Sequence, residues 1–331
     1  MKLSIGIVGL PNVGKSTLFK ILTKQEVHIA NYPFATIDPN IGIVPVPDER
    51  LGALTKLSNS KKTVPAVVEF YDIAGLVKGA SEGEGLGNKF LANIRECKAI
   101  VQVLRCFPLG DIIHVEGSTD PIRDMEIIKI ELIMKDLETV TKRFEKTEKD
   151  LRTGDKKAIH DNGVLKAVKE DLEKGNTAKQ HAFEEVIREL ELLTAKEQVF
   201  LLNGDPEDVP EALTRKITEM GATYIITNLA NAENINDLIK KAYEILNLLS
   251  FFTTGEDETR AWTIEKGWRA PQAAGTIHTD FEHKFIRAEV VAYPKLIEAG
   301  GWGQAKQKGW MRLEGKDYIV QEGDVMVIRH G

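Results

Sequence analysis

The sequence is poor in cysteine and has no long apolar runs. Only two cysteines, Cys97 and Cys106, occur among 331 residues. This argues against a secreted disulfide scaffold and favours a reducing compartment, so we expect a cytoplasmic protein. Neither cysteine has metal-ligand partners at a useful spacing, and we expect both to be buried thiols. No apolar run is long enough to span a bilayer.

An excess of positive charge is also absent. The chain has 44 lysines and arginines against 50 aspartates and glutamates, so the whole molecule is not a general nucleic-acid binder, although a local basic face stays open. There is no internal repeat and no low-complexity tract. The first residues, MKLSIGIVGL, look like a short signal peptide, but they lack a cleavage-site pattern and run into a motif that requires a strand. We therefore interpret them as the first strand.

What the sequence does contain is a series of apolar, β-branched segments typical of buried parallel strands. The length predicts two or three domains. We expect an α/β nucleotide domain formed by residues 1–122 and 194–248, with helices at 16–22 and 236–248. Its strands are predicted at 3–8, 40–46, 67–72, 99–104, 198–202 and 223–227.

A charged segment interrupts this domain, and a small module follows it. Residues 123–193 carry apolar side chains at three- and four-residue spacing, which predicts amphipathic helices that pack on each other. A hairpin break is expected near Gly154 or between Gly163 and Gly175, and a recognition arm is compatible with this pattern. Residues 249–331 predict an α+β module. Its strands are expected at 259–264, 285–291, 318–320 and 325–328.

The strongest motif follows the first strand. Residues 9–16, GLPNVGKS, fit G-x-x-x-x-G-K-[ST] between a strand and a helix, which is the context of a phosphate loop. The glycines let backbone N–H groups point at phosphates, and the helix amino end adds its positive dipole. Lys15 should reach the β- and γ-phosphates, and Ser16 should be a Mg²⁺ ligand. The sequence thus predicts a P-loop nucleoside triphosphatase.

A second motif, D-x-x-G, begins at Asp72. At this distance from a phosphate loop, Asp72 can hold Mg²⁺ through water, and the N–H of Gly75 can meet the γ-phosphate. Thr36 lies between the two motifs and is the expected switch threonine that completes the Mg²⁺ coordination, unless it is an ordinary residue at a strand edge. A glycine-rich stretch at 78–88 is interpreted as the second switch.

Leu76 stands where Ras-like enzymes have a glutamine that orients the attacking water. Leucine cannot form a hydrogen bond with water. Another group must therefore position the water, or the intrinsic hydrolysis is slow.

Several separate segments closely resemble the YchF/Obg-like ATPase family, in the Obg branch of the TRAFAC P-loop GTPases. They are PNVGKST at 11–17, NYPFATI at 31–37, DIAGLVKGA at 72–80 and IIHV at 112–115. RAWTI at 260–264 and APQAAGTIHTDF at 270–281 resemble the carboxy-terminal TGS domain of that family. The resemblance covers nearly the full length of the chain.

This resemblance implies a P-loop G domain with an inserted helical, coiled-coil hairpin and a ubiquitin-like α+β TGS domain. It also implies preference for ATP, Mg²⁺ as cofactor, and binding to the ribosome, with the large subunit expected. The family has a hydrophobic residue at Leu76, and a histidine on a loop helps to position the water there. His114 falls at that motif, although from its position alone it would be an ordinary surface or core histidine.

These arguments define the expected site. The catalytic residues are predicted to be His114 and Lys15. The metal ligands are predicted to be Ser16, Thr36 and Asp72. The nucleotide-binding residues are predicted to be Asn12, Val13, Gly14, Lys15, Ser16, Thr17, Gly75, Asn203 and Leu229.

Base selection departs from the family pattern. Guanine-specific proteins carry N-K-x-D after the fifth strand, and the Obg-like ATPases typically carry N-x-x-E. Here Asn203 matches, but Pro206 stands where the glutamate would be, with Glu207 one place later, and the lysine is absent. The stretch 228–231 suits the next base-contacting loop. We expect ATP, and a relaxed choice between ATP and GTP stays open.

The carboxy-terminal module carries basic residues among tryptophans, a composition that suits contact with rRNA or tRNA. The helical insert is the other segment expected to contact RNA. The alternative is a solvated face with tryptophans in the core. The residues concerned are Lys284, Arg287, Lys295, Lys306, Lys308 and Arg312, with Trp302 and Trp310.

Three functions compete. The first is a ribosome-associated ATPase that acts as a nucleotide-dependent switch in translation or the stress response. The second is a metabolic phosphotransferase, for which no substrate lid or acceptor site is evident. The third is a stress-response adaptor with incidental hydrolysis. A monomer without membrane contact is expected.

Overall fold

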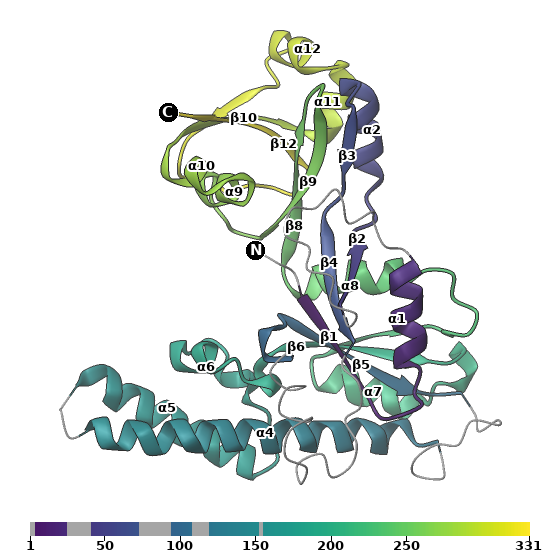
Figure 1. The fold of residues 1–331 in the computed structure, drawn as a ribbon, viewed down its shortest axis with the longest axis vertical. Coiled ribbons are helices and arrows are strands. Elements are labelled where there is room, and N and C mark those ends of the chain that lie inside the picture. Colours follow the sequence, from purple (N-terminus) through teal and green to yellow (C-terminus); the bar gives the residue numbers. More distant parts are fainter. Residues whose placement is uncertain (1–3, 25–40, 73–93, 108–118, 152–154) are drawn as a thin grey trace.

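The computed structural model describes residues 4–24, 41–72, 94–107, 119–151 and 155–331. Figure 1 shows a sheet with flanking helices, a long helical arm beside it, and a second sheet at the opposite end of the molecule. Among the described residues, none of the helices combines the length and the apolar composition that crossing a bilayer requires.

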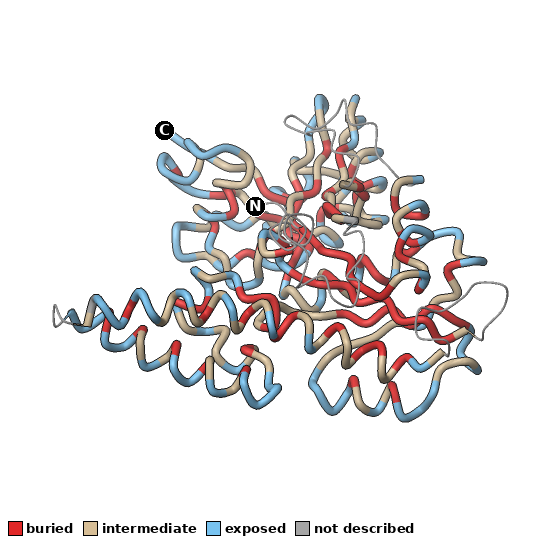
Figure 2. Tube along the Cα trace, turned by 60° about the horizontal axis from the view of Figure 1, so that its bottom comes forward, coloured by how far each residue is buried: buried red, intermediate tan, exposed pale blue. Residues whose placement is uncertain are grey.

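The first sheet is the predicted α/β sheet. Its strand order is β2-β4-β1-β5-β6-β7, with β2 antiparallel to β4 and the other neighbours parallel. Every residue of β1 and β5 is buried, because helices cover both faces of the sheet, and Figure 2 shows this central band. The strands are β1 (Ser4–Val8), β2 (Ile41–Pro45), β4 (Val67–Asp72), β5 (Ala99–Arg105), β6 (Glu197–Asn203) and β7 (Thr223–Ile226).

Helices α1 (Lys15–Lys24), α7 (Glu211–Glu219) and α8 (Asn236–Ile245) flank this sheet. Their apolar sides join two cores. Leu18 and Leu22 of α1 and Leu238 of α8 pack in the larger core, and Leu213 of α7 packs in a smaller one with Phe200. The core thereby holds the amino end of α1 at the carboxyl end of β1.

The helical arm consists of α4 (Pro121–Asp150), α5 (Lys156–Glu173) and α6 (Glu185–Leu190), with short 3₁₀ turns at Ala178–His181 and Leu193–Ala195. Asp120 caps α4 by accepting a hydrogen bond from the N–H of Arg123. The chain reverses between Asp150 and Lys156, so the break expected near Gly154 is confirmed. A second break lies within the range from Gly163 to Gly175, because α5 ends at Glu173, whereas Gly163 itself lies inside α5.

The second sheet is mixed, with the order β11-β10-β12-β8-β9-β3. Its strands are β3 (Lys62–Val64), β8 (Leu248–Thr254), β9 (Glu258–Glu265), β10 (Phe285–Ala292), β11 (Arg312–Glu314) and β12 (Asp324–His330). Its helices are α9 (Ala270–Ile277), α10 (Thr279–His283), α11 (Tyr293–Ala299) and α12 (Trp302–Gln307).

One predicted strand of this module, 318–320, is wrong. Ile319 forms only an isolated bridge with Arg269. The backbone of the segment pairs with the turn before α9, because the N–H of Ala270 donates to the carbonyl of Tyr318 and that of Val320 donates to Trp268. The hydrogen bonds are therefore made, but with a turn and not with a strand.

A segment from the amino-terminal part completes the second sheet. Residues 46–66, here termed the excursion, leave the first sheet after β2 and return at β4; they contain α2 (Glu49–Ser58) and β3. β3 pairs in parallel with β9, where Lys62 is opposite Glu258. The range 1–122 predicted for the nucleotide domain did not anticipate this contact.

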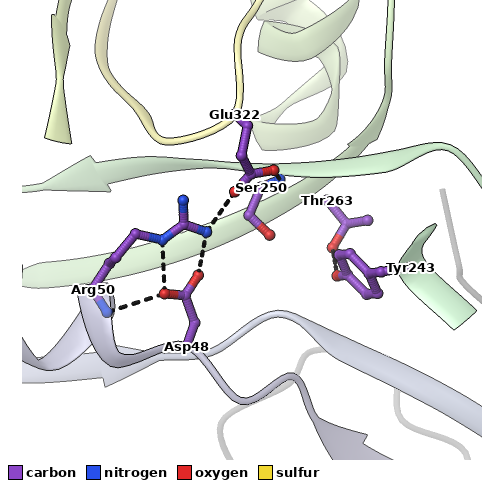
Figure 3. Close-up of polar contacts among 6 residues, drawn as sticks. All are labelled: Asp48, Arg50, Tyr243, Ser250, Thr263 and Glu322. Carbon is purple, nitrogen blue, oxygen red and sulfur yellow. Dashed lines mark hydrogen bonds and ion pairs between the residues drawn. The ribbon is translucent and has the colours of Figure 1, made fainter. Parts of the chain in front are cut away.

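Polar contacts hold the excursion in place (Figure 3). Nε and Nη2 of Arg50 donate to the two carboxylate oxygens of Asp48 at 2.9 and 2.7 Å, and Nη2 also contacts Glu322. Glu322 in turn accepts from the N–H of Ser250 in β8 at 2.9 Å. The start of α2 is thus tied to the loop before β12 and, through Glu322, to strand β8.

Candidate functional site

The phosphate loop joins β1 to α1. At Gly9, where φ is 156°, a Cβ would lie 2.6 Å from the carbonyl oxygen of Val103. Asn12 has a φ of 62°, a left-handed conformation that asparagine tolerates better than most residues. The loop therefore needs a glycine at its start for lack of space, and an asparagine suits its turn.

Lys15 is the centre of this loop. Its side chain is buried, and Nζ donates to the carbonyl oxygens of Gly9 and Leu10 at 2.9 and 2.7 Å. The loop thus wraps around the ammonium group. Ser16 and Thr17 are exposed in the first turn of α1, whose amino end carries the helix's positive dipole.

Asn203, at the end of β6, clamps two loops together. Its Nδ2 donates to the carbonyl oxygen of Val13 at 2.8 Å, and its Oδ1 accepts from the N–H of Leu229 at 3.0 Å. Asn203 and Leu229 are both buried, at 4% and 2% exposure. Gly14 fits beneath them, since a Cβ there would lie 2.4 Å from Nδ2 of Asn203. The structure therefore brings Val13, Gly14, Asn203 and Leu229 together.

Asp72 ends β4, the strand next to β1. In the parallel pairing of these strands Asp72 is opposite Ile7, two residues before the phosphate loop. The backbone of Asp72 therefore lies at the carboxyl end of the parallel strands, the end from which the phosphate loop and Ser16 follow β1. The predicted residues Thr36, Gly75, Leu76 and His114, and the stretch 78–88, lie outside the described residues.

Sequence reasoning missed a contact between the loops after β6 and β7. Oδ2 of Asp205 accepts a hydrogen bond from Nδ2 of Asn228 at 3.0 Å. The sequence could have indicated this contact, because two neighbouring parallel strands place the loops at their carboxyl ends on the same side of the sheet. The pairing of Leu202 with Ile226 places the two loops side by side.

Sequence reasoning also missed Arg105, which is fully buried at the end of β5 opposite Asn203. Burial lowers the pKa of its guanidinium, and the charge of Asp124 opposes that shift. The guanidinium lies 4.1 Å from the centre of the Phe107 ring. The electrostatic interaction with Asp124 links the end of β5 to the first turn of α4.

The basic residues of the carboxy-terminal module do not form a single free patch. Arg312 pairs with the buried Asp324 at 3.2 Å, and Trp302 packs against the core between α2 and the second sheet. Nζ of Lys308, in contrast, lies 4.5 Å from the centre of the Trp310 ring. The alternative of core tryptophans thus applies to Trp302.

A mostly parallel sheet, a phosphate loop and a buried lysine at the centre of that loop define a P-loop nucleoside triphosphatase. A family model for the carboxy-terminal domain of YchF GTPases, described as a protein of unknown function, matches residues 248–331. A second, described as a 50S ribosome-binding GTPase, matches residues 4–143.

Proteins similar over the full length agree with these matches. A Bacillus subtilis (strain 168) protein named ribosome-binding ATPase YchF is 46% identical, with 99% of each chain covered. One of the same name from Escherichia coli O157:H7 is 43% identical, with 98% of each chain covered. The solved structure of the Schizosaccharomyces pombe YchF GTPase is 38% identical with a TM-score of 0.84, covering 99% of this chain and 98% of that one. The chain belongs to the YchF family.

Proposed function

We propose that this protein is a Mg²⁺-dependent ATPase that hydrolyses ATP to ADP and phosphate and binds the ribosome as a nucleotide-dependent switch. The observation that carries this is the phosphate loop closed around the Lys15 ammonium, in a chain whose relatives are named ribosome-binding ATPases. The role of the switch would be in translation or the stress response, in the cytoplasm.

In this proposal the loop backbone and Lys15 bind the β- and γ-phosphates. The ammonium would stabilise the negative charge that develops there. Ser16 is exposed and Asp72 is the last residue of the neighbouring strand β4, and hydroxyl and carboxylate groups are oxygen donors of the kind that Mg²⁺ prefers. These two residues and Thr36 would hold the ion, which would neutralise phosphate charge when bound.

Water activation is assigned to His114, since leucine at position 76 has no polar group for this purpose. Gly75 would meet the γ-phosphate through its N–H. A His114→Ala variant that binds ATP normally should hydrolyse it more slowly in single-turnover measurements. Hydrolysis at the wild-type rate would remove His114 from the mechanism.

The test of the nucleotide site is Lys15→Ala. Loss of the central ammonium should abolish binding of a fluorescent ATP analogue, because no other described lysine lies within the loop. Unchanged binding would contradict the proposed site. In the wild-type protein, competition between ATP and GTP tests the base, and GTP binding about a hundredfold tighter (some 2.7 kcal/mol) would refute the ATP assignment.

A GTPase, or a switch that accepts both nucleotides, is the second candidate. It is favoured by the Schizosaccharomyces pombe relative, which is named a GTPase, and by the amino-terminal family model, which is described as a ribosome-binding GTPase. The absence of a carboxylate at Pro206 argues against specificity for guanine. The same competition experiment separates the two.

Ribosome binding is tested by co-sedimentation with ATP, with ADP and without nucleotide. We propose the large subunit as partner, in keeping with the description of the amino-terminal family model, and contacts with rRNA or tRNA through residues 123–193 and 249–331. Charge reversal at Lys306 and Lys308 should weaken co-sedimentation at low salt. The protein is proposed to act as a monomer, and no association in any nucleotide state would refute the switch.

A further inference from the structure

The loops after β6 and β7 are held next to the phosphate loop by their own hydrogen bonds. Asn203 joins Val13 to Leu229, as described above, and the N–H of Gly204 donates to the carbonyl oxygen of Thr227 at 3.3 Å. In open α/β sheets, ligands bind outside the carboxyl ends of the strands. A nucleotide whose phosphates lie at α1 therefore has its base near these two loops.

Asp205 is an exposed carboxylate residue in the first of these loops. Its backbone is locked, because its N–H donates to Oδ2 of Asp208 at 3.2 Å and its carbonyl oxygen accepts from the N–H of Asp208 at 2.9 Å. The neighbouring Pro206, where a base-selecting carboxylate was expected, has no polar side-chain atom. Glu207 is exposed within the short 3₁₀ turn Pro206–Asp208.

Asn228 orients the Asp205 carboxylate. The N–H of Ala230 donates to Oδ1 of Asn228 at 3.1 Å, which leaves the amide nitrogen of Asn228 to face Asp205. That nitrogen donates to Oδ2 of Asp205 at 3.0 Å. Each ionised carboxylate oxygen has more than one acceptor site, so this bond leaves capacity for a ligand donor.

We propose that Asp205, positioned by Asn228, selects the nucleobase by accepting a hydrogen bond from the 6-amino group of adenine. This deepens the proposed ATPase function and rests on it. The carboxylate performs the task one residue earlier in the loop than the N-x-x-E pattern places it. A carboxylate also repels the 6-oxo group of guanine and hypoxanthine, which offers only acceptor lone pairs at that position.

The test compares ATP with purine riboside triphosphate, which lacks the 6-amino group, by competition against a fluorescent ATP analogue. The wild-type protein should bind ATP roughly ten- to a hundredfold more tightly, as expected for a hydrogen bond to a charged group. Asp205→Ala should bind the two nucleotides with equal affinity. Asn228→Ala should reduce the ratio, and Asn228→Gln should restore part of it.

Glu207→Ala is the matched control, because it removes an exposed carboxylate two residues away. It should keep the wild-type ratio, and loss of the ratio in this variant alone would assign selection to Glu207 and overturn the proposal. An Asp205→Ala variant that still discriminates, with an unchanged melting temperature, would overturn it too, as would tighter binding of GTP by the wild type. If the wild type binds neither ATP nor GTP, the proposed function itself fails.

Discussion

At Gly14, the structure leaves no room for a side chain. A Cβ would lie 2.4 Å from Nδ2 of Asn203 and 3.1 Å from Cδ1 of Leu229, and φ is 112°. Gly14→Ala should therefore displace Asn203 from Val13, at a cost of about 1–3 kcal/mol for overpacking. We expect a loss of nucleotide affinity of at least about tenfold, corresponding to 1.4 kcal/mol, in a fluorescence titration.

The matched control is Gly163→Ala. Gly163 lies within α5, and no described heavy atom lies within 4 Å of the position of its Cβ. Alanine should stabilise the helix there by about 0.5–1 kcal/mol without changing nucleotide affinity. A Gly14→Ala protein that binds as the wild type does would contradict the clamp formed by Asn203.

The two cysteines are buried thiols, as the sequence predicted. Cys97 is 1% exposed and Cys106 is 7% exposed, and burial raises the pKa of each thiol to about 12. Since the thiolate is the reactive form, the native protein should react slowly with a thiol reagent at pH 8. Two thiols should react promptly in guanidinium chloride. Rapid labelling of the native protein would show that one of them is accessible.

At the scale of elements, the ion pair between Arg50 and Glu322 connects α2 with the loop before β12. Hydrogen bonding to Asp48 is the main cause that raises the pKa of Arg50, followed in the same direction by Glu322. The side chains of Arg50 and Glu322 are 29% and 50% exposed. A double-mutant cycle with Arg50→Ala and Glu322→Ala should therefore give only about 0.5–1 kcal/mol of coupling in denaturant unfolding.

Lys61 and Asp257 provide the control for that cycle. They form an ion pair at 2.8 Å between the excursion and the second sheet, but their side chains are 77% and 92% exposed. Their coupling should be indistinguishable from zero. Equal coupling in both cycles would mean that burial does not determine the strength of these pairs.

Asp136, in the middle of α4, holds the last 3₁₀ turn of the arm, Leu193–Ala195, against α4. Its buried carboxylate accepts from the N–H groups of Leu193 and Thr194 at 2.8 and 2.7 Å and from the Thr194 hydroxyl at 2.7 Å. Asp136→Ala would leave these donors unpaired, and unfolding free energy should fall by about 2–3 kcal/mol. Thr194→Val removes one donor and should cost less; an equal or greater loss would place the main role elsewhere.

Elements whose signal lies in contiguous residues could be predicted, and contacts between residues far apart in the sequence could not. The phosphate loop and β1 are contiguous in sequence, so their motif identifies them. Asn203 was recognised by motif, but its bond to Val13 joins residues 190 positions apart and has no local signature. β3 is three residues long and depends on β9 for its pairing. The segment 318–320 has strand composition, yet it pairs with a turn.

At the scale of the whole molecule, the sequence predicted an interrupted nucleotide domain, a helical insert and a carboxy-terminal module. The structure contains a first sheet, a helical arm inserted between its strands β5 and β6, and a second sheet. The match to the Schizosaccharomyces pombe YchF structure extends over 99% of the chain with a TM-score of 0.84. The exact domain limits stay a prediction, because the excursion belongs to the first sheet by sequence and to the second by hydrogen bonding. No periodicity in the sequence indicates that a segment between two strands of one sheet pairs with a strand of another sheet.

The excursion has a consequence for the order in which the protein can fold during synthesis. β3 leaves the ribosome long before β9, its partner, and Leu51 and Leu54 of α2 pack in a core that also requires Phe252, Leu296 and Val325. Chains fold from the amino terminus as they are made, and distant pairings form late. The segment between β2 and β4 therefore reaches its final structure only after the last strand, β12, has been translated. A chain interrupted before residue 258 would lack the strand on which β3 forms.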